Sequence, residues 1–250
     1  LVAACRTGED AVVGTGEQPT ERTDANHVRA QVLRTLCLGT DPAAPIHEMG
    51  LRLAGAWIDG PLDLEAATLS RRLLLRNCRI DGEILLRHAT TVTLAMPGTR
   101  SAGVTAGSLR CRGDLNLRNG FSSEGEVELL GATIDGDLNC RGGRFEKAKG
   151  NALSADRVKI GGGVFLNTGF HATGEVRLLG ATIGGVLACT GGRFENGAGD
   201  ALSADRAEIG GSAFFDDGFH ATGKVRLLGA TIGGNLDCTG GRFENGAGDA

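Results

Sequence analysis

The chain of 250 residues lacks the sequence features of several common protein classes. No run approaches the roughly 20 consecutive apolar residues of a membrane-spanning helix, and no basic region followed by an apolar stretch forms a signal peptide. No Cys-x-x-Cys pair is present, so a common spacing of metal and redox sites is missing. Gly197-Ala198-Gly199 continues to Leu202, where a dinucleotide-binding loop requires glycine. We therefore expect no metal, no cofactor and no catalytic residue.

Glycine, in contrast, is abundant, with 42 residues, and it accompanies an internal repeat. The segment Phe170–Ala201 recurs as Phe219–Ala250, 49 positions later, with three differences, and Phe121–Ala152 is a more diverged copy. A fixed period of this length is typical of a stacked-repeat architecture. With 41% hydrophobic residues and a net charge of only −4, one elongated domain with a core is expected.

A shorter repeat lies inside the long one. Triplets such as Val225-Arg226-Leu227 and Ala230-Thr231-Ile232 follow one another at steps of five or six residues, and the middle residue is mostly polar. In a strand, the outer two residues point to one side and the middle residue to the other. Glycine between triplets, as at Gly180 and Gly229, tolerates the positive φ of a sharp corner. Each triplet is therefore expected to be a short strand followed by a tight turn.

Four triplets make one coil of 21 or 22 residues, or of 27 where a corner carries an insert, and 22 plus 27 equals the long period of 49. The inserts are expected at Pro97–Gly103, Glu146–Ala152, Glu195–Ala201 and Glu244–Ala250. The pattern predicts an all-β fold, a right-handed quadrilateral parallel β-helix (a solenoid) of about eight coils over residues 51–250. Because the chain begins at Leu1 without methionine and stops inside a repeat, we expect a fragment whose β-helix is truncated at the C-terminus.

The first 50 residues differ from the repeats. Residues 1–22 are polar, rich in glycine, threonine and glutamate, and without a period, so they are expected to be disordered. Residues 23–50 are expected to form an α-helical cap and a linker. Thr23–Leu38 places apolar residues on one helix face, with Thr23 or the next residue as N-cap and Gly39 at its end. Such a helix would cover the first coil, which otherwise exposes its edge.

The repeats resemble those of known solenoid families. Ala230-Thr231-Ile232 and Ala207-Glu208-Ile209 place a small residue two positions before an apolar one, as in the pentapeptide-repeat proteins. The blocks Val225–Cys238 (VRLLGATIGGNLDC) and Val28–Gly39 (VRAQVLRTLCLG) are similar to actinobacterial repeat proteins often named membrane-associated oxidoreductases. The resemblance implies a bacterial, pentapeptide-repeat-like protein with four-sided coils and, by that name, a redox activity.

Two repeated residue types are candidates for chemistry. Cys140, Cys189 and Cys238 occupy one repeat position and are expected two coils, or ~10 Å, apart, beyond the reach of a disulfide. We expect them to be reduced, buried and purely structural. Asp156 and Asp205, each followed by arginine, recur with the repeat, whereas a catalytic site is normally unique. We interpret each Asp-Arg as a hydrogen-bonding pair at a corner.

An outward row of cationic and titratable side chains is the main candidate site. Residues in the middle of successive triplets on one face are expected to form a column with ~4.8 Å spacing. They are Arg144, His171, Arg193, His220 and Arg242. The column either binds a carboxylate, a phosphate or an acidic protein surface, or is solvated surface neutralised by the carboxylates that begin the adjoining inserts. Those carboxylates are Glu146, Glu195 and Glu244.

These features favour a non-enzymatic β-helical scaffold for protein interaction or anion binding, with an acidic protein partner or a small anion on the cationic column. The alternatives are the oxidoreductase that the resemblance implies and a carbohydrate-acting β-helix enzyme. Phe165 and Phe214 are expected to point outward, two coils apart, and to mark a docking or homodimer surface. Some pentapeptide-repeat proteins imitate DNA, but a net charge of −4 is too small for that role, and no nucleic-acid partner is expected. The expected location is the cytoplasm, or the periphery of a membrane.

Overall fold

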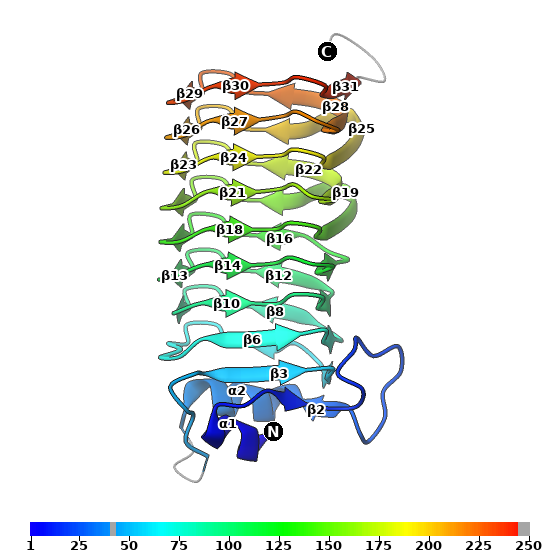
Figure 1. Cartoon of the computed structure of the whole chain (residues 1–250), viewed down its shortest axis with the longest axis vertical. Helices are drawn as coiled ribbons and strands as arrows, with labels where there is room; N and C mark the ends of the chain where they lie inside the picture. Colours follow the sequence, from blue (N-terminus) through cyan, green and yellow to red (C-terminus); the bar gives the residue numbers. More distant parts are fainter. Residues whose placement is uncertain (41–43, 245–250) are drawn as a thin grey trace.

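A computed structural model describes the chain over residues 1–40 and 44–244. It is a right-handed parallel β-helix whose coils stack along one axis (Figure 1). The chain crosses the near side from left to right and returns on the far side as it climbs away from the N-terminus (Figure 1). Each strand of the stack pairs in parallel with its counterparts in the neighbouring coils. The prediction of an all-β solenoid is confirmed.

Three sheets cover the four sides, because the largest sheet turns a corner. The 10-stranded sheet contains β1 (Ala11–Val12), β3 (Leu51–Ala54), β6 (Leu73–Arg76), β10 (Leu94–Ala95), β14 (Leu115–Asn116), β18 (Leu138–Asn139), β21 (Val164–Phe165), β24 (Leu187–Ala188), β27 (Ala213–Phe214) and β30 (Leu236–Asp237). The 7-stranded sheet contains β9 (Thr90–Thr91), β13 (Arg110–Cys111), β17 (Thr133–Ile134), β20 (Lys159–Ile160), β23 (Thr182–Ile183), β26 (Glu208–Ile209) and β29 (Thr231–Ile232).

The 14-stranded sheet forms the remaining two sides. One side contains β2 (His27–Arg29), β4 (Trp57–Asp59), β7 (Arg79–Ile80), β11 (Arg100–Ser101) and β15 (Ser122–Ser123). The other contains β5 (Leu62–Asp63), β8 (Glu83–Leu85), β12 (Gly103–Thr105) and β16 (Val127–Glu128). Longer strands then run across both sides, namely β19 (Arg144–Ser154), β22 (His171–Arg177), β25 (Arg193–Ser203) and β28 (His220–Arg226), and β31 (Arg242–Glu244) pairs with β28.

The inward residues of the triplets fill the interior. From Leu53 to Ala221, the residue that ends each predicted triplet is buried. A stack of phenylalanine rings runs along the axis, with centroids of neighbouring rings 5.1–5.9 Å apart. Its members are Phe121, Phe145, Phe170, Phe194, Phe219 and Phe243. Leu227 and Ile232, in the last described coil, are only partly buried. The described residues do not form a complete coil over them.

The corner between the 14-stranded and 7-stranded sheets requires a left-handed residue in each coil. Gly131 and Gly180 have φ of 61° and 60°, whereas Arg157 and Arg206 have φ of 55° and 57° in the alternate coils. The left-handed region is strained for a residue with a Cβ, so each arginine must be held by its surroundings. The backbone N–H of Arg157 donates to the carbonyl of Leu179 in the next coil at 2.8 Å. Glycine therefore marks this corner in only some of the coils.

The structure corrects the predicted inserts. Pro97–Gly103 is not an insert, because it contains β11, where Ser101 points inward and is buried. A serine at the inward position hid this triplet from a search for apolar residues. Glu146–Ala152 and Glu195–Ala201 do hold extra residues, but they form register irregularities within β19 and β25 instead of separate corners. The predicted insert Glu244–Ala250 lies outside the described residues beyond its first position.

The expectation of disorder for residues 1–22 is wrong. Helix α1 (Val2–Thr7) buries Cys5, and β1 extends the 10-stranded sheet by pairing with β3. Asp10 joins them to the coils, because its carboxylate lies 2.6 Å from Arg52 Nε and 3.0 Å from Arg76 Nη2. The ordered elements of this segment are one short helix and one two-residue strand, which are too short to give the sequence a detectable period.

The cap helix is shorter than predicted. Helix α2 (Ala30–Leu38) begins after residues 27–29, which pair with β4 as strand β2 instead of forming a first helical turn. Thr23 is therefore not the N-cap, a position that Arg29 occupies without a capping side chain. Gly39 ends the helix as predicted, with φ 61°. Leu33 is fully buried, and α2 lies beneath the first coil (Figure 1).

Candidate functional site

The predicted column of cationic residues exists on the outer side of the 14-stranded sheet. Register pairs join Arg144 to His171, His171 to Arg193, Arg193 to His220, and His220 to Arg242. Its members therefore lie on neighbouring paired strands, with the ~4.8 Å spacing of a sheet. We call these five residues the basic–histidine ladder.

Glu195 neutralises the middle of the ladder. Arg193 Nη2 donates a hydrogen bond to Glu195 Oε1 at 2.9 Å. The other oxygen, Oε2, lies 3.3 Å from His171 Nε2 in the preceding coil. Glu195 thus pairs with the arginine two residues before it and with the histidine one coil below.

The same arrangement recurs one repeat later. Glu244 Oε1 lies 2.5 Å from Arg242 Nη2, and its Oε2 lies 3.2 Å from His220 Nε2. The first copy differs, because Ser122 stands in register with Arg144 where the later copies have a histidine. Among the described side chains, Arg144 and Glu146 form no ion pair. Two of the three carboxylates therefore pair with ladder residues.

The pairing changes the acidity of both glutamates. Burial disfavours the charged form of Glu195, but the hydrogen bond from Arg193 and the nearby His171 outweigh this and lower its pKa. The pKa of Glu244 is also lowered, first by the nearby His220 and then by the hydrogen bond with Arg242. Both side chains therefore remain carboxylates to a lower pH than an ordinary glutamate.

The row containing the ladder extends to the N-terminal cap, which the sequence analysis missed. Its earlier members, in register, are His27, Trp57, Arg79, Arg100 and Ser122. His27 Nε2 lies 2.9 Å from Asp59, Arg100 pairs with Glu124, and the Arg79 guanidinium lies 4.3 Å from the centre of the Trp57 ring. An acidic residue two positions after a row member, as at Asp59, Asp81 and Glu124, was the available signal. The sequences of these first coils differ too much from the later repeats for the repeat pattern to show this row.

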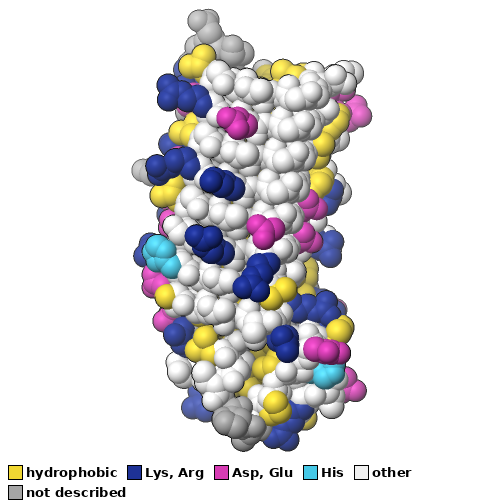
Figure 2. Space-filling model, turned by 90° about the vertical axis from the view of Figure 1, so that its left-hand side faces the viewer, with side chains coloured by type: hydrophobic (Ala, Val, Ile, Leu, Met, Phe, Trp, Pro, Cys, Tyr) yellow, Lys and Arg dark blue, Asp and Glu magenta, His cyan; other side chains and the backbone are white. Residues whose placement is uncertain are grey.

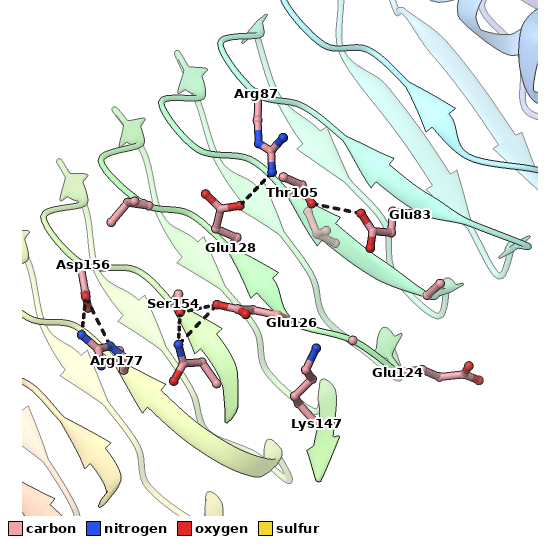
Figure 3. Close-up of a pocket in the computed structure, with 15 residues that line it drawn as sticks. Glu83, Arg87, Thr105, Glu124, Glu126, Glu128, Lys147, Ser154, Asp156 and Arg177 are labelled. Atoms are coloured by element: carbon pink, nitrogen blue, oxygen red, sulfur yellow. Dashed lines mark hydrogen bonds and ion pairs between the residues drawn. The ribbon is translucent and has the colours of Figure 1, made fainter. Parts of the chain in front are cut away.

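A polar groove lies on the adjacent side of the same sheet (Figure 3). Its volume is about 740 Å³. Five carboxylate and three cationic residues contribute to its lining, namely Glu83, Glu124, Glu126, Glu128, Asp156, Arg87, Lys147 and Arg177. The groove lies where coils with short corners give way to the long strand β19, which contributes Lys147 and Asn151. The sequence analysis did not find it, because the groove depends on the different outlines of neighbouring coils.

Hydrogen bonds hold the groove's side chains in place. Ser154 Oγ lies 2.5 Å from Glu126 Oε1 and accepts a hydrogen bond from Asn151 Nδ2 at 2.9 Å (Figure 3). Thr105 Oγ1 donates to Glu83 Oε2 at 3.2 Å. Carboxylates, hydroxyls and an amide side by side suit a ligand with many hydrogen-bonding groups, such as a carbohydrate.

The repeated aspartates at the corner pair differently from the prediction. Asp156 does not bond the adjacent Arg157; its Oδ2 accepts from Arg177 Nη2, one coil above, at 2.7 Å. Asp205 pairs in the same way with Arg226. The Arg177 pKa is raised, chiefly by the hydrogen bond with Asp156. These pairs join neighbouring coils.

The cysteines are free in the structure. Cys140 and Cys189 are fully buried, and burial raises the pKa of both thiols, so they are poor nucleophiles. The expectation of buried cysteines is confirmed for these two. Cys238 is exposed, contrary to the prediction, because it lies in the last described coil. Among the described residues, no group of three or more histidine, cysteine, aspartate or glutamate side chains is placed to hold a metal ion.

Phe165 and Phe214 lie on the outer row of the 10-stranded sheet, with Ala188 between them in register. Both are half-buried. The Arg141 guanidinium covers Phe165, 3.8 Å from the ring centre. Their outward direction is as predicted, and the homodimer surface stays a prediction.

Comparison with known proteins gives no relative. No protein-family model matches the chain, and neither a curated protein nor a solved structure is significantly similar to it. In the part of the chain that the structure describes, neither helix is long and apolar enough to cross a membrane. Inference about function therefore rests on the geometry above.

Proposed function

We propose that the protein is a non-enzymatic β-helical scaffold that binds an acidic protein surface or a small anion on the basic–histidine ladder. The observation that supports this proposal is the strand register, which brings five residues into one row. Successive members of the row are 22 or 27 positions apart in sequence. Arginine offers a planar fork for carboxylate or phosphate, and histidine adds a charge that depends on pH.

The ladder's net charge explains when it would bind. With neutral histidines, its three arginines and the three glutamates Glu146, Glu195 and Glu244 give 3 − 3 = 0. With both histidines protonated, the sum becomes 5 − 3 = +2. Histidine side chains in general gain a proton around pH 6.5, while the two glutamates with lowered pKa remain charged. Binding of an acidic partner is therefore expected to strengthen below about pH 6.5 and to weaken with salt.

Calorimetric titration with a hexa-aspartate peptide at pH 5.5 and pH 7.5 tests the proposal. The native chain should bind more tightly at pH 5.5, and Arg193→Gln with Arg242→Gln should weaken binding by about tenfold or more, since charge-assisted hydrogen bonds are lost. The matched control is Arg110→Gln with Arg112→Gln, two exposed arginines near the 7-stranded sheet. Equal affinities at both pH values, or equal effects of the two double variants, would contradict the proposal. The ladder would then be ordinary surface whose charge is neutralised by its own glutamates.

A second candidate function is favoured by the polar groove, namely binding or cleavage of a carbohydrate. Its carboxylates include Glu126, held by Ser154, and Glu128, whose Oε2 lies 3.8 Å from Arg87 Nη2. Paired carboxylates perform acid–base chemistry in most glycoside hydrolases. A screen of oligosaccharides for binding and for release of reducing ends, with Glu126→Gln and Glu128→Gln as variants, tests this candidate. Absence of both signals would eliminate it.

The redox activity implied by the resemblance to repeat proteins named membrane-associated oxidoreductases has less support. A thiol-based reaction needs a reactive thiolate, whereas burial raises the pKa of Cys78 to about 12 and that of Cys140 and Cys189 further. Absorbance spectra and nucleotide analysis of the purified protein would reveal a redox cofactor if that activity is present.

A further inference from the structure

A hollow of about 520 Å³ opens at the corner between the 14-stranded and 7-stranded sheets. It lies around Leu179 and Gly180, which join β22 to β23. Arg157 borders it from the coil below and Arg206 from the coil above. The volume is within the range of small-molecule sites.

The acidic residues in this hollow are already paired. Asp156 accepts from Arg177 at 2.7 Å and from the backbone N–H of Leu179 at 3.2 Å. Asp205 accepts from Arg226 at 2.5 Å and from the backbone N–H of Leu228 at 2.9 Å. Their negative charge is therefore compensated within the fold.

Arg157 and Arg206, in contrast, carry exposed and uncompensated charge. In the described part of the chain, neither guanidinium forms a hydrogen bond or an ion pair. The corner fixes both backbones, through the bonds from Arg157 N to Leu179 O at 2.8 Å and from Arg206 N to Leu228 O at 2.9 Å. The backbones of Arg157 and Arg206 are two coils, or about 10 Å, apart. The corner residue of the coil between them is Gly180, which has no side chain to fill the space.

Apolar side chains complete the hollow. Leu179 is half-buried and Leu228 is exposed, and both line it. Along the upper left edge of the face shown in Figure 2, dark blue and yellow side chains alternate, which is the pattern that arginine and leucine in alternate coils produce. The hollow thus offers two cationic forks and an apolar surface at one place.

We propose that this hollow binds an amphiphilic anion, with a phosphate or carboxylate head group between Arg157 and Arg206 and an apolar body against Leu179 and Leu228. Two guanidiniums match the planar or tetrahedral oxygens of such a head group. Among the described residues, no side chain pairs with either guanidinium. The apolar part would cover leucine surface that otherwise faces water.

The preceding repeat provides an internal comparison. The hollow around Leu130 and Gly131 has about 300 Å³, and its two arginines are Arg157 and Arg87, of which Arg87 is already paired, with its Nη2 3.8 Å from Glu128 Oε2. Ser108 stands there in the place that Arg157 has in the larger hollow. Within the described coils, the two-arginine arrangement across a glycine corner is formed between Arg157 and Arg206.

The test is calorimetric titration of the whole chain with hexyl phosphate, inorganic phosphate and hexanol. Hexyl phosphate should bind at least about tenfold more tightly than either of the others, because it uses both parts of the hollow. Arg157→Gln with Arg206→Gln should weaken hexyl phosphate by about tenfold or more, through loss of charge-assisted hydrogen bonds. Leu179→Ser should weaken hexyl phosphate and leave inorganic phosphate unchanged.

A matched variant separates this site from other surface arginines. Arg110→Gln with Arg112→Gln, two exposed arginines outside the hollow, should bind hexyl phosphate as the native chain does. Sedimentation with vesicles containing phosphatidic acid distinguishes a membrane lipid from a soluble ligand. Vesicle binding that is lost in Arg157→Gln with Arg206→Gln would assign a lipid head group. Binding of hexyl phosphate without vesicle binding would assign a soluble ligand. The proposal is overturned if hexyl phosphate binds no better than inorganic phosphate, or if removing both arginines leaves its affinity unchanged.

Discussion

Neighbouring residues of one triplet face opposite environments, so they differ sharply in what a substitution costs. In β23, Ile183 is buried and Thr182 is exposed on the outer side. Ile183→Asp should lower the free energy of unfolding by several kcal/mol, about 4 or more, because it places an unpaired charge between packed coils. Thr182→Asp should change it by about 0.5 kcal/mol or less. Urea denaturation of both variants measures the difference, and similar midpoints would contradict the inward and outward assignment.

Glu195 makes a contribution to stability that depends on pH. Its pKa is lower in the folded chain than in the unfolded chain, so its contribution is present above the unfolded value of about 4.3 and is lost as pH falls through the folded value. Glu195→Gln should therefore be less stable than the native chain at pH 6, and the difference should shrink steadily below about pH 4. Thermal melts of both proteins from pH 6 to pH 3 measure this. A difference that stays constant across that range would show that the pairing with Arg193 and His171 does not stabilise the fold.

Across the coils, the phenylalanine stack contributes the largest fully buried side chains of the interior. Phe170 lies between Phe145 and Phe194, with ring centroids 5.2 and 5.4 Å away. Phe170→Ala should lower the free energy of unfolding by about 3–5 kcal/mol, because it leaves a cavity in the middle of the stack. Phe165→Ala, on the outer side beneath Arg141, should cost only about 1 kcal/mol. Equal losses for the two variants, measured by urea denaturation, would contradict a continuous interior stack.

Strand and coil assignments followed from the sequence wherever apolar residues ended the triplets. Leu178, Ile183 and Cys189 repeat the pattern closely, and all are buried as predicted. The assignment failed at Ser101, because burial there follows from register with the coils above and below and not from the residue itself. It failed again at β1 and α1, which are ordered by contacts with the first coils, such as those of Asp10.

The candidate sites show the same division. The ladder was predictable, because a constant period fixes which residues share a row. Its pairing with Glu195 was anticipated as an alternative, and the bridge to the histidine one coil below became visible only with side-chain positions. The groove and the Arg157–Arg206 hollow depend on where neighbouring coils differ in outline, and no pattern within a single coil contains that information.

At the scale of the whole molecule, the N-terminal cap covers the strand edges of the first coil. The first coil would otherwise offer unpaired strand edges to other chains. β1 and β2 cover two of its sides, and α2 lies against β5, with Arg34 Nη1 3.4 Å from Asp63 Oδ1. Leu33 is the fully buried residue of α2 and therefore the main hydrophobic contact of the cap.

Leu33→Lys should release α2 from the first coil, because the substitution buries an ammonium group without a partner. The exposed edge of β5 should then promote self-association, seen as species larger than those of the native chain by light scattering after size-exclusion chromatography. Hydrogen exchange should increase in β5 and little in β23, because coils of a solenoid interact mainly with their neighbours. Gln31→Lys, at an exposed position of the same helix, is the control and should keep the oligomeric state of the native chain. A Leu33→Lys chain with the oligomeric state of the native chain and unchanged exchange in β5 would show that β1 and β2 alone protect the first coil.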